Sequence, residues 1–182
     1  LAVGIGISSA PAQAQVTAFM QAVAVAASGD KALAEFYRST NYQAIWTGTV
    51  SKDRARRAAL LKALGSAGDH GLPQDAYETQ YLQANLRSVR SQRDLGRIEV
   101  ELSKLFLEYA RDIQTGVLVP TRVNKDIVRK VPLRDRLGTL VNFSKSSPAG
   151  FLKSLVPDSA EYNRLMKEKI SMERVVAGGG WG

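Results

Sequence analysis

The 182-residue sequence contains no cysteine and a single histidine, His70. Without cysteine the chain can form no disulfide, no thiolate zinc site and no thiolate nucleophile. One histidine is too few for a multi-histidine metal centre, so we predict neither a metal ion nor a cofactor. Long apolar runs are also missing, since no stretch approaches the roughly 18 apolar residues of a membrane-spanning helix. These absences exclude thiol enzymes and most metalloenzymes.

The first 15 residues, LAVGIGISSAPAQAQ, carry no charge and begin with a short apolar run. The triplet at residues 12–14, Ala-Gln-Ala, matches the small-x-small pattern that signal peptidase recognises. We interpret residues 1–14 as the remnant of a secretory signal peptide whose basic start is missing. The alternative is an Ala/Gly-rich tail. The first interpretation predicts a periplasmic protein that begins near Gln15.

Helical patterns cover most of the remaining chain. The strongest, at 93–113, carries an apolar stripe at helical spacing. Gly116 follows it as a helix-ending residue, and residues 117–131 have no helical period and are predicted to be an extended excursion. The other predicted helices cover 16–27, 31–39, 52–64, a segment restarting at Pro73, a segment from Pro132 to Phe143, and 158–177.

Polar residues at the predicted helix starts support these boundaries. Asp30, Ser51 and an Asp158/Glu161 capping box are the predicted N-terminal caps. In the last helix the predicted inner positions are Tyr162, Leu165, Met166 and Val176. The prediction is therefore a mostly α protein with one irregular helical domain of six to seven helices at 15–177. Residues 178–182 are predicted to be the Gly-rich start of a linker.

The search for catalytic motifs finds little. Glycines at 65, 68 and 71 lack the Gly-Lys-Ser/Thr ending of a phosphate-binding loop. His70 lies beside Asp69 as a general base would, but no activated nucleophile is visible for it to serve. Asp69, Asp75 and Glu78 could act as a pair of glycosidase carboxylates. The simpler interpretation is that they are acids stabilised at helix starts.

The net charge of +8 is concentrated in two segments. Residues 51–62 hold five basic residues against one acidic, and residues 122–136 hold six against two. Such clusters form solvated faces or contact anionic partners such as envelope polymers and lipid headgroups. Nucleic acid is not expected, because neither cluster carries aromatic residues at stacking spacing. The candidate contacts are Lys52, Arg54, Arg56, Arg57, Arg122, Lys125, Arg129, Lys130, Arg134 and Arg136, and the first four are predicted to point outward.

Tyr42 and Trp46 lie four residues apart, with the amides of Asn41 and Gln43 beside them. Aromatic faces flanked by amides can bind sugar rings. They can also close a hydrophobic core with one polar edge in water, and this second interpretation is the one we favour.

Several short motifs occur together in a specific order. The first are Phe36-Tyr37, Asn41-Tyr42-Gln43 with Ile45-Trp46, and His70-Gly71-Leu72 with Tyr77. The next are the series Leu102, Phe106, Leu107, Tyr109, Asp112 and Gly116, then Tyr162 with Leu165, and finally Gly178-Gly179-Gly180-Trp181. Over residues 36–181 this pattern resembles the N-terminal scaffold domain of the large murein L,D-transpeptidases of Gram-negative bacteria. It departs from that family in ending on Trp-Gly, where Trp-Pro is usual.

The resemblance implies an exported protein in which a helical scaffold precedes a peptidoglycan-binding module and a catalytic domain. In such proteins a catalytic cysteine in a Ser/Thr-His-Gly-Cys setting makes 3→3 cross-links between stem peptides. Because this chain has no cysteine, the resemblance implies a non-catalytic scaffold domain, with peptidoglycan or the catalytic part of the parent enzyme as its partner. The candidate murein or interdomain contacts are Tyr42, Trp46, His70, Tyr77 and Trp181. The alternative function is a small murein hydrolase that uses the acids near 69–78.

Overall fold

The computed structural model describes residues 17–77, 79–128 and 132–181. These residues form nine α-helices and two 3-10 helices, with no β-strand among them, which confirms the predicted mostly α class. The predicted signal remnant, 1–14, lies outside this part of the chain. In chain order the elements are α1 (Ala18–Ala27), α2 (Lys31–Ser39), α3 (Ser51–Gly65), η1 (Ala67–His70), η2 (Gln74–Tyr77), α4 (Thr79–Ser88), α5 (Gln92–Thr115), α6 (Pro120–Val123), α7 (Arg136–Lys145), α8 (Pro148–Leu155) and α9 (Ala160–Ala177).

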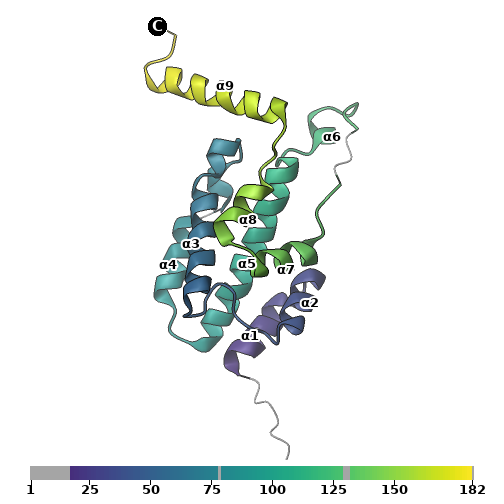
Figure 1. The fold of residues 1–182 in the computed structure, drawn as a ribbon, viewed down its shortest axis with the longest axis vertical. Coiled ribbons are helices and arrows are strands. Elements are labelled where there is room, and N and C mark those ends of the chain that lie inside the picture. Colours follow the sequence, from purple (N-terminus) through teal and green to yellow (C-terminus); the bar gives the residue numbers. More distant parts are fainter. Residues whose placement is uncertain (1–16, 78, 129–131, 182) are drawn as a thin grey trace, which may run out of the picture.

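Helix α5 runs through the middle of the molecule, and the other helices of the body pack around it (Figure 1). Its N-terminal cap is Ser91, whose Oγ accepts the backbone N–H of Asp94 at 3.1 Å. The helix ends at Gly116, which has a φ of 72° that L-residues rarely adopt. The apolar stripe predicted from the sequence is largely buried, with Leu102 and Phe106 fully inaccessible.

Helices α1 and α5 cross in direct contact at Gly96. A Cβ atom at this position would lie 2.7 Å from the carbonyl oxygen of Phe19 and 2.8 Å from the Cβ of Ala22. The two helices can therefore approach this closely only because residue 96 has no side chain.

An aromatic cluster fills the core between α5, α7 and the irregular segment that precedes α3. The indole ring of Trp46 stacks on the ring of Phe143 with a centroid separation of 5.0 Å. Phe106 lies 4.5 Å from Phe143, and Phe151 of α8 contacts both of these phenylalanines. The segment that carries Trp46 is thus held in the core by its aromatic side chain.

Three helix starts differ from the prediction. Ser51 is the first residue of α3 and makes no capping hydrogen bond. Helix α7 begins after Asp135, which accepts the N–H of Gly138 at 2.6 Å, and not at Pro132. Helix α9 is capped by Ser159, which accepts the N–H of Tyr162 at 3.1 Å. At α9 the adjacent residues Asp158 and Ser159 can both act as caps, and sequence alone does not decide between them.

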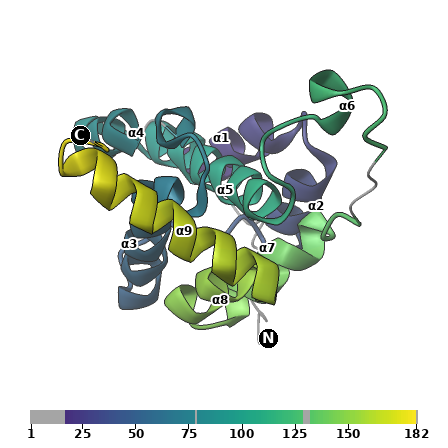
Figure 2. The same ribbon diagram turned by 90° about the horizontal axis from the view of Figure 1, so that it is seen from above.

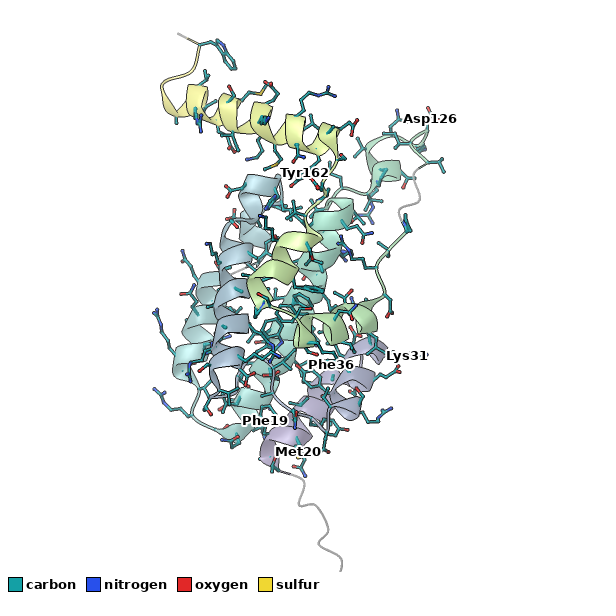
Figure 3. The ribbon with its side chains drawn as sticks, viewed as in Figure 1. Phe19, Met20, Lys31, Phe36, Asp126 and Tyr162 are labelled. Atoms are coloured by element: carbon teal, nitrogen blue, oxygen red, sulfur yellow. The ribbon has the colours of Figure 1, made fainter. Side chains whose placement is uncertain are left out.

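The structure also contains helices that the sequence analysis did not predict. Helix α8 starts at Ser147-Pro148, a pairing typical of helix N-termini. The short helix α6 lies inside the segment predicted to be extended, and Asp126 lies near the tip of that segment (Figure 3). The helix following Pro73 is a 3-10 turn, with α4 after it. The described residues therefore contain more helices than the predicted six to seven.

Helix α9 lies across one end of the bundle and packs against η1 (Figures 1 and 2). None of its residues is buried. The predicted inner positions Leu165 and Val176 are both 67% exposed, so that part of the prediction is wrong. Tyr162 and Met166 are only partly buried. The helical period shows that α9 has an apolar face, but it does not show that this chain covers that face.

None of the helices in the described ranges combines the length and apolar character needed to cross a bilayer.

Candidate functional site

A groove of about 980 Å³ runs between α3 and α8, and residues of η1 and α9 border it. This volume lies at the upper end of the range typical of small-molecule sites. Small side chains on both walls leave the space open. They are Ala59 and Ala63 on α3, Ser66 directly after it, and Ala149, Gly150 and Ser154 on α8.

The two walls of the groove each carry a lysine. Lys62 belongs to α3 and Lys153 to α8, and neither forms an ion pair within the described residues. Asp158 adds one carboxylate to the lining, and it accepts a hydrogen bond from Asn163 Nδ2 at 3.3 Å. Two ammonium groups facing a shared space favour a negatively charged ligand.

The hydroxyl groups of the groove are not arranged for covalent chemistry. Ser66 Oγ donates to the carbonyl oxygen of Lys62 at 3.1 Å, and Ser154 Oγ donates to that of Phe151 at 2.7 Å. An activated nucleophile would instead donate to a general base. Neither serine therefore has the partner that would activate it.

His70 connects the body of the domain to α9. Its Nδ1 lies 2.6 Å from the hydroxyl oxygen of Tyr162, and the two rings stack with a centroid separation of 6.4 Å. Burial lowers the pKa of His70 below its ordinary value, and Lys169 lowers it further while Asp69 opposes the shift. The neutral imidazole can accept a hydrogen bond from the Tyr162 hydroxyl at Nδ1.

Acidification is expected to destabilise the domain through His70. Because the folded-state pKa of His70 is depressed, the unfolded chain binds the proton more readily. The contribution of His70 to stability is full above about pH 6.5, the ordinary pKa, and falls as the pH drops through the folded-state pKa. Urea unfolding of the wild type and of His70→Gln, measured between about pH 7.5 and pH 5, should show a steeper loss in the wild type. If the stability of the wild type and of His70→Gln falls equally with pH, His70 does not have this role.

The aromatic residues predicted as partner contacts lie in different environments. Trp46 is fully buried and Tyr77 is 1% exposed, so neither ring has surface for an external ligand. Tyr42 is half-buried and adopts a φ of 56°. Trp181 is 78% exposed. Among the five candidates only His70 lines the groove.

Trp46 and Tyr77 are held by buried polar partners on α5. Trp46 Nε1 donates to Ser103 Oγ at 2.7 Å, and the hydroxyl of Tyr77 donates to Asp112 Oδ2 at 3.1 Å. Burial raises the pKa of the Tyr77 hydroxyl, and the nearby Asp112 carboxylate raises it further. Trp46 therefore anchors the segment before α3 to the central helix, and Tyr77 anchors η2 to it.

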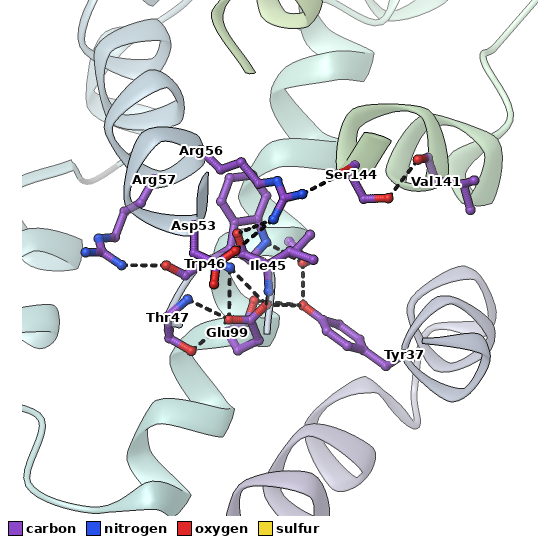
Figure 4. A network of polar contacts seen from close by, with 11 residues as sticks. Tyr37, Ile45, Trp46, Thr47, Asp53, Arg56, Arg57, Glu99, Val141 and Ser144 are labelled. Carbon is purple, nitrogen blue, oxygen red and sulfur yellow. Dashed lines mark hydrogen bonds and ion pairs between the residues drawn. The ribbon is translucent and has the colours of Figure 1, made fainter. Parts of the chain in front are cut away.

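Sequence reasoning did not find the buried carboxylate of Glu99, which is fully inaccessible on α5 (Figure 4). Its two oxygens accept the backbone N–H groups of Ile45, Trp46 and Thr47 at 2.7 to 3.2 Å. The hydroxyls of Thr47 and Tyr37 donate to the same carboxylate at 2.8 and 3.1 Å. Burial raises the pKa of Glu99, and the backbone hydrogen bonds oppose this shift.

Much of the first basic cluster stabilises the fold instead of facing solvent. Arg56 was predicted to point outward, but it is 5% exposed and forms an ion pair with the buried Asp53 at 2.8 Å. Its Nη2 donates to the carbonyl oxygen of Ser144 at 2.5 Å. Arg57 donates to the carbonyl oxygen of Trp46, also at 2.5 Å. Lys52 and Arg54 are exposed, as predicted.

The second basic cluster is also partly bound within the fold. Arg134 donates to backbone carbonyl oxygens, and Arg136 forms an ion pair with Asp30. Arg122 and Lys125 are exposed. Arg129 and Lys130 lie outside the described residues. Figures 1 and 2 place α3 and α6 on opposite sides of α5, so the exposed parts of the two clusters do not share one face.

The acids considered for hydrolysis do not form a site in the described residues. Asp69 and Asp75 are exposed in the two 3-10 helices and do not line the groove, and Glu78 lies outside the described ranges. Within those ranges there is also no group of three or more residues that could hold a metal ion.

The described residues form an all-α domain built around one long helix, with an open groove between α3 and α8. The model of the Scaffold domain family matches residues 31–168, and the chain therefore belongs to this family. The match extends from the start of α2 into α9 and so includes both the Glu99 network and the groove. Searches of curated proteins and of solved structures returned no match.

Proposed function

We propose that this chain is the non-catalytic scaffold domain of an exported murein L,D-transpeptidase-like protein that acts in peptidoglycan cross-linking. Two findings support the proposal. The chain belongs to the Scaffold domain family over residues 31–168, and its sequence motifs resemble those of the scaffold domain of these transpeptidases.

The observation that carries the proposal is the way the motif residues pair with one another in the fold. Tyr37 and Trp46 share Ser103, each at 2.7 Å from its Oγ. In the same way Tyr77 contacts Asp112, and His70 contacts Tyr162. Hydrogen-bonded pairs of this kind hold the segments of a domain rigidly together, as a scaffold requires. The catalytic cysteine of such a protein would belong to a separate domain.

The groove between α3 and α8 is the proposed contact surface of this scaffold. Murein stem peptides are short and carry carboxylates, which matches a groove with a lysine on each wall. The catalytic part of the parent transpeptidase is the other proposed partner. We also propose a periplasmic location, because the N-terminal segment resembles the end of a signal peptide.

The non-catalytic assignment is tested with purified tetrapeptide muropeptides. The 182-residue chain alone should form no 3→3 cross-linked dimers, because it offers no thiolate nucleophile. Dimers formed by this chain alone would refute the assignment. Sequencing the gene beyond the Gly182 codon tests the parentage, which predicts an in-frame peptidoglycan-binding module and a Ser-His-Gly-Cys motif. A different catalytic domain there would refute the parentage.

The murein contact is tested by co-sedimentation of the chain with purified sacculi. The double variant Lys62→Glu/Lys153→Glu should bind roughly tenfold more weakly, since two charge contacts are reversed. Lys31→Glu/Lys104→Glu is the matched control, because both lysines are exposed, lie outside the groove and belong to neither basic cluster. Equal retention of the two double variants would contradict a role for the groove.

A further inference from the structure

A second, smaller pocket of about 140 Å³ lies between α5, α7 and the segment that leads into α7. Three arginines from these three elements line it, namely Arg111, Arg134 and Arg136. The remaining wall is mainly apolar and includes Leu107, Ala110 and Leu133. The pocket therefore combines guanidinium groups with a hydrophobic surface.

Hydrogen bonds to α5 and α8 fix Arg134 in the pocket wall. Its Nη1 donates to the carbonyl oxygen of Ala110 at 3.2 Å, and its Nη2 donates to that of Leu155 at 3.0 Å. The backbone on either side of Leu133 is held by Gln114, which donates to the Pro132 carbonyl oxygen at 2.6 Å and accepts the Arg134 N–H at 3.2 Å. This wall is formed before any ligand arrives.

The three arginines differ in how their charges are balanced. Arg111 forms an ion pair with the buried Asp112 at 2.6 Å and lies 3.8 Å from Glu108. Arg136 forms an ion pair with Asp30. Arg134 has carbonyl partners only, and no carboxylate pairs with it among the described residues. Its positive charge is therefore the uncompensated one in this pocket.

We propose that this pocket binds a small carboxylate carried on a short apolar stem. A guanidinium presents parallel N–H donors that match the two oxygens of a carboxylate. The carbonyl contacts of Arg134 use one hydrogen of each terminal nitrogen, so further donors remain for the ligand. The stem would contact Leu107 and Leu133. A cavity of about 150 Å³ holds a benzene ring, so about six heavy atoms fit.

The proposal is tested by titrating the full chain with sodium isobutyrate and following arginine Nε–H and leucine methyl signals by NMR. Saturable shifts are expected at Arg134, Leu107 and Leu133. Uncharged isobutyramide, which has the same shape, should produce none. Shifts that grow linearly with isobutyrate, as they do with chloride at equal ionic strength, would overturn the proposal. Tighter saturation by inorganic phosphate would overturn the choice of a carboxylate.

A surface substitution tests the pocket without disturbing the core. Leu133 is 64% exposed. Leu133→Glu places at the pocket a negative charge, which repels a carboxylate ligand. It should weaken isobutyrate binding at least about tenfold. Leu118→Glu is the matched control, because Leu118 is 72% exposed and does not line the pocket. Equal affinities in these two variants would overturn the assignment.

The role of Arg134 is tested by Arg134→Gln against Arg122→Gln. Both substitutions remove one positive charge, but Arg122 is exposed on α6 and lies outside the pocket. Isobutyrate affinity should fall at least about tenfold in the first variant and stay within about twofold in the second. If Arg134→Gln does not fold, the comparison of Leu133→Glu with Leu118→Glu still decides the proposal.

Discussion

Replacing Glu99 by alanine is expected to unfold the domain at ordinary temperatures or to leave it barely stable. The substitution removes the acceptor for three consecutive backbone N–H groups and for the hydroxyls of Tyr37 and Thr47. Each buried donor left without a partner costs about 1–3 kcal/mol, so the total loss exceeds about 4 kcal/mol. A domain of this size has about 5–15 kcal/mol to lose.

Thermal and urea unfolding monitored by circular dichroism measure this effect. Glu101→Ala is the matched control, because Glu101 is exposed on the same helix. The stability of Glu99→Gln should lie between those of Glu99→Ala and Glu101→Ala. Its amide keeps one carbonyl oxygen as an acceptor but adds an NH₂ group that needs partners. If Glu99→Ala unfolds at the same urea concentration as Glu101→Ala, the network does not stabilise the fold.

The second large effect is expected for Trp46→Ala, which should lower the free energy of unfolding by about 3–5 kcal/mol. The substitution leaves a cavity beside Phe143, on which the indole ring stacks. It also leaves Ser103 without the indole N–H that it accepts at 2.7 Å. Because Trp46 is fully buried, the surrounding side chains can fill this space only in part.

Trp181→Ala is the control for this prediction, because Trp181 is 78% exposed. Its effect should stay within about 0.5 kcal/mol. Loss of the Trp46 signal also allows the fluorescence of each tryptophan to be assigned. Equal unfolding free energies for the two variants would show that the aromatic cluster does not hold the irregular segment in place.

The long central helix could be predicted because its apolar residues recur over many turns. Residues 93–113 were predicted and α5 extends over Gln92–Thr115. Asp30 was also predicted correctly as a cap, since its carboxylate accepts the N–H groups of Ala32 and Leu33. Local signals of this kind depend on neighbours within one or two turns. Helix α8 spans only eight residues, so its apolar pattern covers little more than two turns.

Glu99 and Arg56 are not identified as buried in the sequence analysis, although their positions on apolar helix faces indicate it. Glu99 lies three residues before Leu102 and seven before Phe106, on the apolar stripe of α5. Arg56 lies four residues before Leu60 and eight before Leu64 on α3. A charged residue on such a stripe indicates a buried polar partner. The identity of that partner depends on tertiary contacts, which in the case of Glu99 span more than 50 positions.

The crossing of α1 and α5 at Gly96 places a constraint on which sequences can adopt this fold. Glycine inside a helix costs about 1 kcal/mol relative to alanine, so local preference alone would select alanine at this position. An alanine there would push α1 away from α5 and uncover Val23, which is fully buried on α1. Position 96 therefore distinguishes sequences that keep this crossing from those of a generic helical bundle with the same hydrophobic pattern.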